Sequence, residues 1–300
     1  EQQAAASEAL VATFSDMHTD WHAWEGGSLA QANVELAAGR PFRPGPGILL
    51  LLQTANRLSA QSGGLFNPTI GKLVNLWGFH ADEIIALEPP EPAAIRELLA
   101  LTPSAGDVRL DNGEFVSDNP AVQYDLGAFA KGYAIDRGIE LLQSQGIAHA
   151  IINAGGDLRA IGKHGDRPWR IGIRHPRQAG VLASVELSEN ESIFTSGDYE
   201  RYFEASGRRY HHIIDPRTGY PATDTVSVTV MHRDAATADA AATALFVAGP
   251  DGWIEVARRM GIRFVMLIDA DGIVHMNPAM QSRVQFEGDA PEIRLSRPLT

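Results

Sequence analysis

"TVSVTVMHRDAATADAAATALFVAG", residues 225–249, carries two different residue patterns that together decide the fold class. Its first part, Thr225–Met231, is rich in β-branched side chains and predicts a strand. The alanine-rich run Asp234–Gly249 predicts a helix that stops at Gly249-Pro250. Helices mixed with strands that form hairpins predict an α+β fold.

The rest of the chain repeats this mixture. "IRFVMLI", residues 262–268, predicts a strand, and "DADG", residues 269–272, predicts a hairpin turn rather than a calcium loop. We predict further helices at residues 7–22, 48–61, 93–101 and 130–145, and further strands at residues 122–126, 148–153 and 273–276.

Composition limits the class of protein. The 300 residues suffice for one elaborated domain or two small ones. A net charge of −12 argues against a broad basic surface for nucleic acid, and the lack of Cys excludes disulfides and thiolate chemistry. The longest apolar run, Ile48–Leu52, is far too short to span a bilayer, and the opening "EQQAAASEAL" does not resemble a secretory signal.

Two polar residues stand out in the alanine-rich helix. Asp239 and Thr243 are four residues apart, so they project from one helix face, one turn apart. A carboxylate and a hydroxyl are hard oxygen donors that suit Mg²⁺. The alternative is that Asp239 only complements the dipole of the first turn, with Thr237 as N-cap.

Glycine-rich segments flank the predicted central helix. In "YDLGAFAKGYAIDRG", residues 124–138, Lys131 lies near a helix start, where the dipole disfavours a cation unless an anion shares the site. The alternative is a solvated Lys beside a helix cap. In "NAGGD", residues 153–157, the paired glycines permit either close approach to a ligand or a plain tight turn.

Two other segments are unusual. His211 and His212 are adjacent, so in a strand they point to opposite faces, and one of them is a candidate proton acceptor; the alternative is a structural role. "GLFNPTIGKLVNLWGFH", residues 64–80, fits either core packing or an aromatic ligand site.

Taken in order, the motifs resemble those of the FAD:protein FMN transferases, the ApbE-like flavin transferases. The resemblance runs from about Trp21 to beyond Pro278. It is carried by "LFNPTIGKLVNLWGF", "DLGAFAKGYAID", "NAGGDLRAIG", "TSGDYERYFEASGRRYHHIIDPRTGYP" and "TADAAATALFVAG". It implies an α+β fold of mixed and antiparallel sheets with packed helices, a ligand cleft between lobes, and one flavin transferase domain over residues 1–300.

The resemblance also implies an activity. Such enzymes cleave FAD between its phosphates, attach FMN to a Thr or Ser hydroxyl of a target flavoprotein, release AMP and require Mg²⁺. By motif position, the implied metal ligands are Asp239, Thr243 and the backbone carbonyl of Ala128, and the implied general base is His212. The implied flavin-nucleotide contacts are Trp24, Leu65, Phe66, Asn67, Asp125, Lys131 and Ile214.

The chain departs from the family pattern at two of these motifs. Asn67 stands where relatives commonly have Asp, and Ala242 where some offer a third helical carboxylate. The family usually begins with a strand carrying a Met-Gly-Thr element, whereas this sequence opens inside the first predicted helix.

The resemblance implies partners and a location as well. We expect FAD and an acceptor flavoprotein, such as a subunit of a membrane redox complex, as partners, and no nucleic acid. We expect the periplasm, although this chain shows no Cys for a lipid anchor. Two other functions stay open: an Mg²⁺-dependent FAD pyrophosphatase that yields FMN and AMP, and a non-catalytic flavin-binding protein.

Overall fold

The computed structural model describes residues 2–24, 26–80, 84, 88–288 and 291–299. The chain divides into two compact units. The first comprises Glu1–Ser15, Phe129–Gly197 and Thr223–Thr300, and the second comprises Asp16–Ala128 and Asp198–Ala222. Within the described ranges, no helix is both long and apolar enough to cross a membrane.

A seven-stranded sheet forms the centre of the first unit, in the order β14-β12-β11-β10-β7-β4-β3. Every neighbouring pair is antiparallel except β12 and β14, which are parallel. The strands are β3 (Ala150–Ala154), β4 (Asp157–Ile161), β7 (Asn190–Gly197), β10 (Thr225–His232), β11 (Phe264–Asp269), β12 (Val274–Met276) and β14 (Ile293–Leu295). The predicted "DADG" turn joins β11 to β12, which confirms the hairpin.

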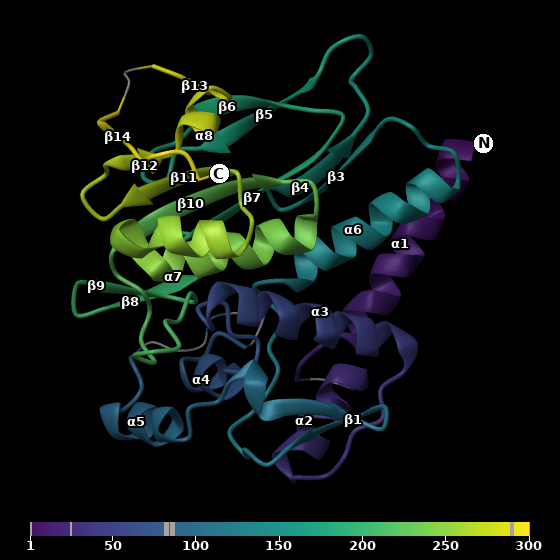
Figure 1. Cartoon of the computed structure of the whole chain (residues 1–300), viewed down its shortest axis with the longest axis vertical. Helices are drawn as coiled ribbons and strands as arrows, with labels where there is room; N and C mark the ends of the chain where they lie inside the picture. Colours follow the sequence, from purple (N-terminus) through teal and green to yellow (C-terminus); the bar gives the residue numbers. More distant parts are fainter. Residues whose placement is uncertain (1, 25, 81–83, 85–87, 289–290, 300) are drawn as a thin grey trace. The chain divides into compact units, whose positions relative to one another are not determined.

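Helices α6 (Ala130–Ser144) and α7 (Ala235–Arg259) cover one face of this sheet (Figure 1). A three-stranded sheet of β5 (Trp169–Arg174), β6 (Val181–Leu187) and β13 (Val284–Phe286) lies over the other face. Alternate residues of the central strands, such as Ile193 and Met231, share a buried apolar cluster with β5, β6 and the short α8 (Pro278–Gln281). The first unit therefore has three layers.

The helix predicted at residues 234–249 is the first part of α7. Gly249, with φ 70° and ψ −178°, breaks the helix, and Pro250 begins a second helical stretch that ends at Arg259. The N-cap is Asp234, whose side chain accepts a 2.7 Å hydrogen bond from the Thr237 N–H. Thr237 is therefore not the cap, and Asp239 lies beyond the first three residues of the helix. The alternative that made Asp239 a partner of the helix dipole under a Thr237 cap is wrong.

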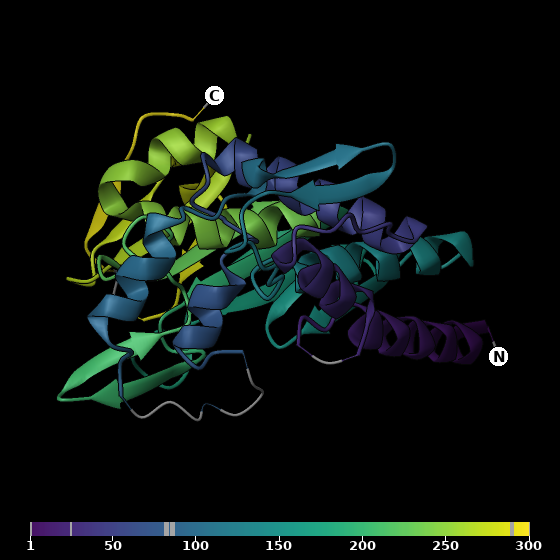
Figure 2. The same ribbon diagram turned by 90° about the horizontal axis from the view of Figure 1, so that it is seen from below.

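The second unit is largely helical. It contains the end of α1 (Gln2–Asp20), α2 (Ser28–Ala37), α3 (Pro46–Ser62), α4 (Gly71–Leu76), α5 (Pro92–Ala100), the 3₁₀ turn η1 (Ala105–Asp107) and two hairpins, β1–β2 (Val108–Asp111, Glu114–Ser117) and β8–β9 (Tyr202–Ala205, Arg208–His211). The β8–β9 hairpin packs beside α4 and α5 (Figure 2). Their shared core is centred on Trp77, whose ring stacks on Tyr210 and whose indole N–H donates to the Gly219 carbonyl.

The strand predicted at Val122–Leu126 is absent. The amides of Gln123 and Asp125 donate to the carbonyls of Thr69 and Pro68, but the amide between them, that of Tyr124, donates to the Asn33 side chain. The segment thus bonds to the backbone of residues 68–69 and to one side chain, and it does not form the continuous hydrogen-bond ladder of a strand. Gln123 and Ile70 form an isolated bridge.

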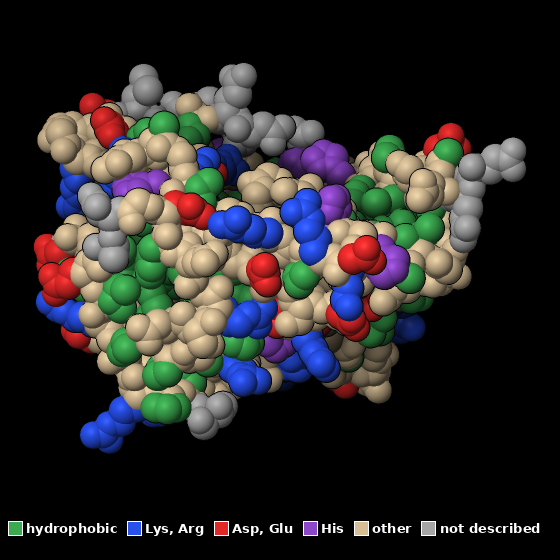
Figure 3. All heavy atoms as spheres, turned by 90° about the horizontal axis from the view of Figure 1, so that it is seen from above, with side chains coloured by type: hydrophobic (Ala, Val, Ile, Leu, Met, Phe, Trp, Pro, Cys, Tyr) green, Lys and Arg blue, Asp and Glu red, His purple; other side chains and the backbone are tan. Residues whose placement is uncertain are grey.

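Charged side chains are mixed on the visible surface. In Figure 3, Lys and Arg side chains alternate with Asp and Glu, and hydrophobic side chains appear in small separate groups.

Candidate functional site

The first group of predicted site residues lies where α6 and α7 meet, in the first unit. Asp239 is buried, with 5% of its surface exposed, and its Oδ2 accepts a 2.9 Å hydrogen bond from the Gly132 N–H. Burial raises the pKa of Asp239 to about 7; the nearby Lys131 lowers it, and Asp157 raises it. When Asp239 ionises, the nearby positive charge of Lys131 therefore does not fully offset the cost of burying the carboxylate.

Gly132 makes this contact possible. A Cβ at this position would lie 2.3 Å from the carbonyl oxygen of Ala235 and 2.9 Å from Cα of Ala236. These neighbours are backbone atoms, which cannot swing away as a side chain would. The glycine between Lys131 and Tyr133 is thus required by the close crossing of the two helices, with its own backbone in a helical conformation.

Lys131 has a fixed acid partner. Its ammonium pairs with Oδ2 of Asp157, at the start of β4, and the other oxygen of Asp157 accepts a 2.9 Å hydrogen bond from the Thr195 N–H on β7. Asp157 is buried, whereas 49% of the Lys131 side chain is exposed. Asp157, itself bonded to the sheet, therefore holds the partly exposed ammonium group of Lys131 in place. A fixed, exposed cation of this kind is suited to binding an anionic ligand.

Thr243 follows Asp239 by one helical turn and is half-buried. Its Oγ1 lies 3.3 Å from Oγ of Ser196, which projects from β7. The local donor set is one carboxylate and two hydroxyls, all hard oxygens, and a buried carboxylate with a raised pKa is stabilised as an anion by a cation. These residues fit Mg²⁺. In the part of the chain that the structure describes, no group of three or more His, Cys, Asp or Glu is placed to hold a metal; the predicted set has one such residue.

The predicted base, His212, lies in the second unit, directly after β9. Its Nδ1 lies 3.2 Å from the Arg201 carbonyl oxygen, which can only accept, so Nδ1 carries the proton and Nε2 of the neutral ring does not. His211 differs: it is buried, its Nε2 donates to the Ala222 carbonyl at 2.7 Å, and its Nδ1 accepts from the Ile213 N–H. The pair thus separates into a structural His and a candidate base.

Asp125 lies in a cationic setting in the second unit. Its Oδ1 accepts a 2.9 Å hydrogen bond from the Gly127 N–H. Burial raises its pKa, against the opposing effect of that hydrogen bond and of Arg201, His80 and His22. Trp24, the predicted aromatic contact, lies edge-on to His80 with ring centroids 5.2 Å apart.

Several residues predicted to contact the flavin pack in the core or form hydrogen bonds within the chain. The Phe66 side chain is 1% exposed, and Ile214 belongs to the core cluster around Trp77. The Asn67 amide donates to the Pro103 carbonyl, and its oxygen accepts from the N–H and hydroxyl of Thr69. Leu65 is half-buried. Contacts from Phe66 and Ile214 to a ligand would therefore come from backbone atoms rather than from their buried side chains.

Ala128, the predicted carbonyl ligand, lies in the turn before α6 and belongs to the second unit. Its role stays a prediction. Sequence reasoning missed three residues that the structure joins to the group around Asp239: Gly132, Asp157 and Ser196. The signal for Asp157 was its place at the end of the "NAGGD" motif, immediately after two glycines.

Comparison with known proteins agrees with this fold. The model of the ApbE family matches residues 1–266. The chain belongs to the ApbE family. An ApbE protein from Thermotoga maritima, known from its crystal structure, is 32% identical and superposes with a TM-score of 0.85, covering 93% of this chain and 91% of that one. The predicted ApbE-like α+β fold, with mixed and antiparallel sheets and packed helices, is confirmed.

Two ApbE relatives have named activities. The FAD:protein FMN transferase of Rhodobacter capsulatus is 45% identical over 291 residues, which cover 95% of this chain and 55% of that protein. The FAD:protein FMN transferase of Treponema pallidum (strain Nichols) is 38% identical over 240 residues, which cover 74% of this chain and 65% of that protein. The chain thus spans less than two thirds of the length of either relative.

Proposed function

We propose that the chain is an FAD:protein FMN transferase that modifies a Thr or Ser of an acceptor flavoprotein. In this reaction the acceptor hydroxyl oxygen attacks the FMN phosphorus of FAD. The phosphorus–oxygen bond to the AMP phosphate breaks, AMP leaves, and the hydroxyl proton passes to a base. The support is membership of the ApbE family and the names of the two relatives.

One geometric observation carries the proposal: the buried Asp239, which accepts from the Gly132 N–H, and the exposed cation Lys131, which pairs with Asp157, lie together where α6 meets α7. Attack on a pyrophosphate requires neutralisation of its negative charge. Asp239 and Thr243 would hold Mg²⁺, and bound Mg²⁺ would supply charge neutralisation at the pyrophosphate. Lys131, anchored by Asp157, would contact a phosphate oxygen directly.

His212 would accept the proton from the acceptor hydroxyl. The hydrogen bond from Nδ1 to the Arg201 carbonyl selects the tautomer in which Nε2 is the proton acceptor. General-base catalysis of this kind is worth about 10²–10⁴-fold in rate. Asp125, with Trp24 and the backbone of residues 65–67 and 214, would bind the flavin nucleotide within the second unit.

We further propose that residues 1–300 work as one transferase domain, that the acceptor is a redox subunit at a membrane, and that the reaction takes place in the periplasm. The resemblance of the five motifs to the flavin transferases supports these points.

The test mixes the chain with FAD, Mg²⁺ and a Thr-bearing flavoprotein domain. Fluorescent flavin that stays on the acceptor through denaturing electrophoresis, together with AMP, is the expected result. AMP release at the same rate without an acceptor would replace the transferase by a pyrophosphatase. Binding of FAD with no AMP formed would contradict both enzymatic functions and leave a flavin-binding protein.

A further inference from the structure

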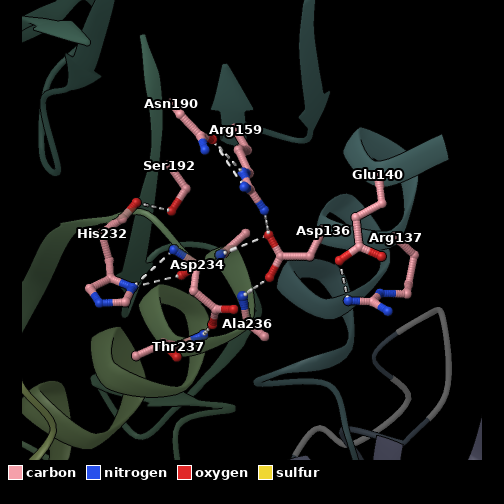
Figure 4. A network of polar contacts seen from close by, with 11 residues as sticks. Asp136, Arg137, Glu140, Arg159, Asn190, Ser192, His232, Asp234, Ala236 and Thr237 are labelled. Atoms are coloured by element: carbon pink, nitrogen blue, oxygen red, sulfur yellow. Dashed lines mark hydrogen bonds and ion pairs between the residues drawn. The ribbon is translucent and has the colours of Figure 1, made fainter. Parts of the chain in front are cut away.

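Asp136 is a buried carboxylate on α6 that the proposed chemistry does not use. It accepts hydrogen bonds from the Ala235 N–H at 3.0 Å and the Ala236 N–H at 2.9 Å, one on each oxygen. The Arg159 guanidinium, from β4, donates to the same oxygen as Ala235 (Figure 4). One side chain of α6 thus satisfies two of the backbone donors that the first turn of α7 leaves without helical partners.

A second carboxylate serves the same helix end differently. Asp234, the N-cap, accepts from the Thr237 N–H at 2.7 Å. Asp234 immediately precedes α7 in the chain, so its bond stabilises the first turn without tying it to another element. Asp136 ties that turn to α6.

A further link joins the same two helices. Gly132, four residues before Asp136 on α6, donates its N–H to Asp239, four residues after Ala235 on α7. Hydrogen bonds therefore join the two helices at two positions, which are about one turn apart along each helix. A shift of α7 along α6 would break both links and would turn the Asp239 carboxylate away from Gly132.

Arg159 anchors the arrangement to the sheet. Its guanidinium, besides pairing with Asp136, donates to the Asn190 side-chain oxygen at 3.0 and 3.2 Å. The side chains of the ion pair are 13% (Arg159) and 4% (Asp136) exposed. Because both partners are nearly excluded from water, loss of either leaves a buried polar group without its counterpart.

We propose that Asp136 is a positioning residue that, by joining α6 to the first turn of α7, fixes the direction of the Asp239 carboxylate and of the Thr243 hydroxyl. The inference deepens the proposed function and rests on it where Asp239 serves as a metal ligand. The order of the α7 turn itself does not depend on that function.

The test compares Asp136→Asn with Asp234→Ala in the full chain. The Asn side chain keeps the shape but turns an N–H donor toward a backbone N–H or toward Arg159. The control removes a hydrogen-bond acceptor from the same helix end and leaves the link to α6 intact. Two readouts need no turnover: amide hydrogen exchange of peptides that cover residues 235–243, and Mn²⁺ binding followed by electron paramagnetic resonance, with Asp239→Ala as the reference for a lost ligand.

Asp136→Asn is expected to accelerate exchange through residue 243 and to weaken Mn²⁺ binding about tenfold or more, as loss of supporting residues around metal ligands commonly does. Asp234→Ala is expected to affect exchange only in the first turn and to bind Mn²⁺ within about twofold of the parent. Asp136→Ser, which removes the carboxylate without adding a misplaced donor, replaces Asp136→Asn if that variant does not fold.

Two results would overturn the positioning role. One is Mn²⁺ binding and exchange in Asp136→Asn that equal those of the parent. The other is an equal effect of Asp234→Ala, which would reduce Asp136 to a general stabiliser of the helix end. A parent chain that binds Mn²⁺ through Asp239 but transfers no FMN would refute the proposed function alone.

Discussion

The backbone N–H of Gly132 on α6 lies 2.9 Å from Oδ2 of Asp239 on α7 and donates a hydrogen bond to it. The preceding residue, Lys131, pairs with Asp157. Two consecutive residues of α6 therefore have separate roles: Gly132 orients the buried carboxylate of Asp239, and Lys131 supplies an exposed positive charge. The bond requires a residue without a side chain, because a Cβ would meet the backbone of Ala235.

Gly132→Ala should destabilise the fold by about 1–3 kcal/mol, the usual cost of overpacking a closely fitted contact. Urea unfolding at a fixed pH measures the change. Gly47→Ala is the control, since a Cβ at that position of α3 would meet no other atom within 4 Å. It should leave stability unchanged or raise it, because Ala favours helices. Equal losses in both variants would contradict the close crossing at Gly132.

Asp239→Ala should abolish the Mg²⁺ dependence of FMN transfer and lower the rate by at least about a hundredfold, as expected when a group that stabilises charge in the transition state is lost. A titration with Mg²⁺ at saturating FAD measures both. Glu255→Gln removes an exposed carboxylate from the far end of the same helix and should change neither. An unaltered Mg²⁺ titration in Asp239→Ala would refute the ligand assignment.

The raised pKa of Asp239, about 7 and caused chiefly by burial, predicts a pH-dependent stability of the metal-free chain. The folded state holds this proton more tightly than the unfolded state, in which the carboxyl has its ordinary pKa of 3.8. The stabilising contribution is therefore complete below about pH 4 and is lost as the pH rises to about 7.

Relative to Asp239→Asn, which has no such group to titrate, the parent should lose about 2.5 kcal/mol of unfolding free energy between about pH 5 and 8. Urea unfolding in EDTA at each pH gives the difference. Parallel pH curves for the two proteins would show that Asp239 has an ordinary pKa.

His212→Ala should bind FAD as the parent does but transfer FMN about 10²–10⁴-fold more slowly. Flavin fluorescence measures binding and AMP release measures the rate. His211→Ala should instead lower the melting temperature, since both ring nitrogens of that buried His bond to the backbone. Near-normal transfer by His212→Ala would remove it as the base.

Asp157→Asn should raise the KM for FAD about tenfold, because Lys131 loses the carboxylate that holds it near the proposed phosphate position. Steady-state kinetics with varied FAD measure this change. Lys163→Met, which breaks the exposed pair with Glu189, should leave KM unchanged. A KM in Asp157→Asn equal to that of the parent would show that Lys131 needs no anchor.

Helices were the most predictable part of the fold. Helical periodicity located α3 and α6 within a few residues, and Gly63, in the αL conformation, ends α3. The helix α2 was missed, and the predicted strand at Val122–Leu126 is not one. Its apolar residues Val122 and Tyr124 are buried, as they would be in a strand. The Tyr124 N–H, however, donates to the Asn33 side chain instead of a neighbouring strand, and no local residue pattern reveals that partner.

The site was predictable only where spacing is local. Asp239 and Thr243 share a helix, so their common face follows from four residues of separation. Lys131 and Asp157 are 26 residues apart, and Asp136 meets Ala236 across 100 residues. Such pairs depend on how strands and helices pack, which residue patterns in a single sequence do not specify.

The central claim is covalent transfer of FMN, and the intact mass of the acceptor tests it most directly. After incubation with the chain, FAD and Mg²⁺, the acceptor should gain the mass of one FMN less one water, with one AMP released for each adduct. The gain should disappear when the acceptor Thr is replaced by Val. An acceptor of unchanged mass, in a mixture where FAD is bound and Mg²⁺ is present, would contradict the account.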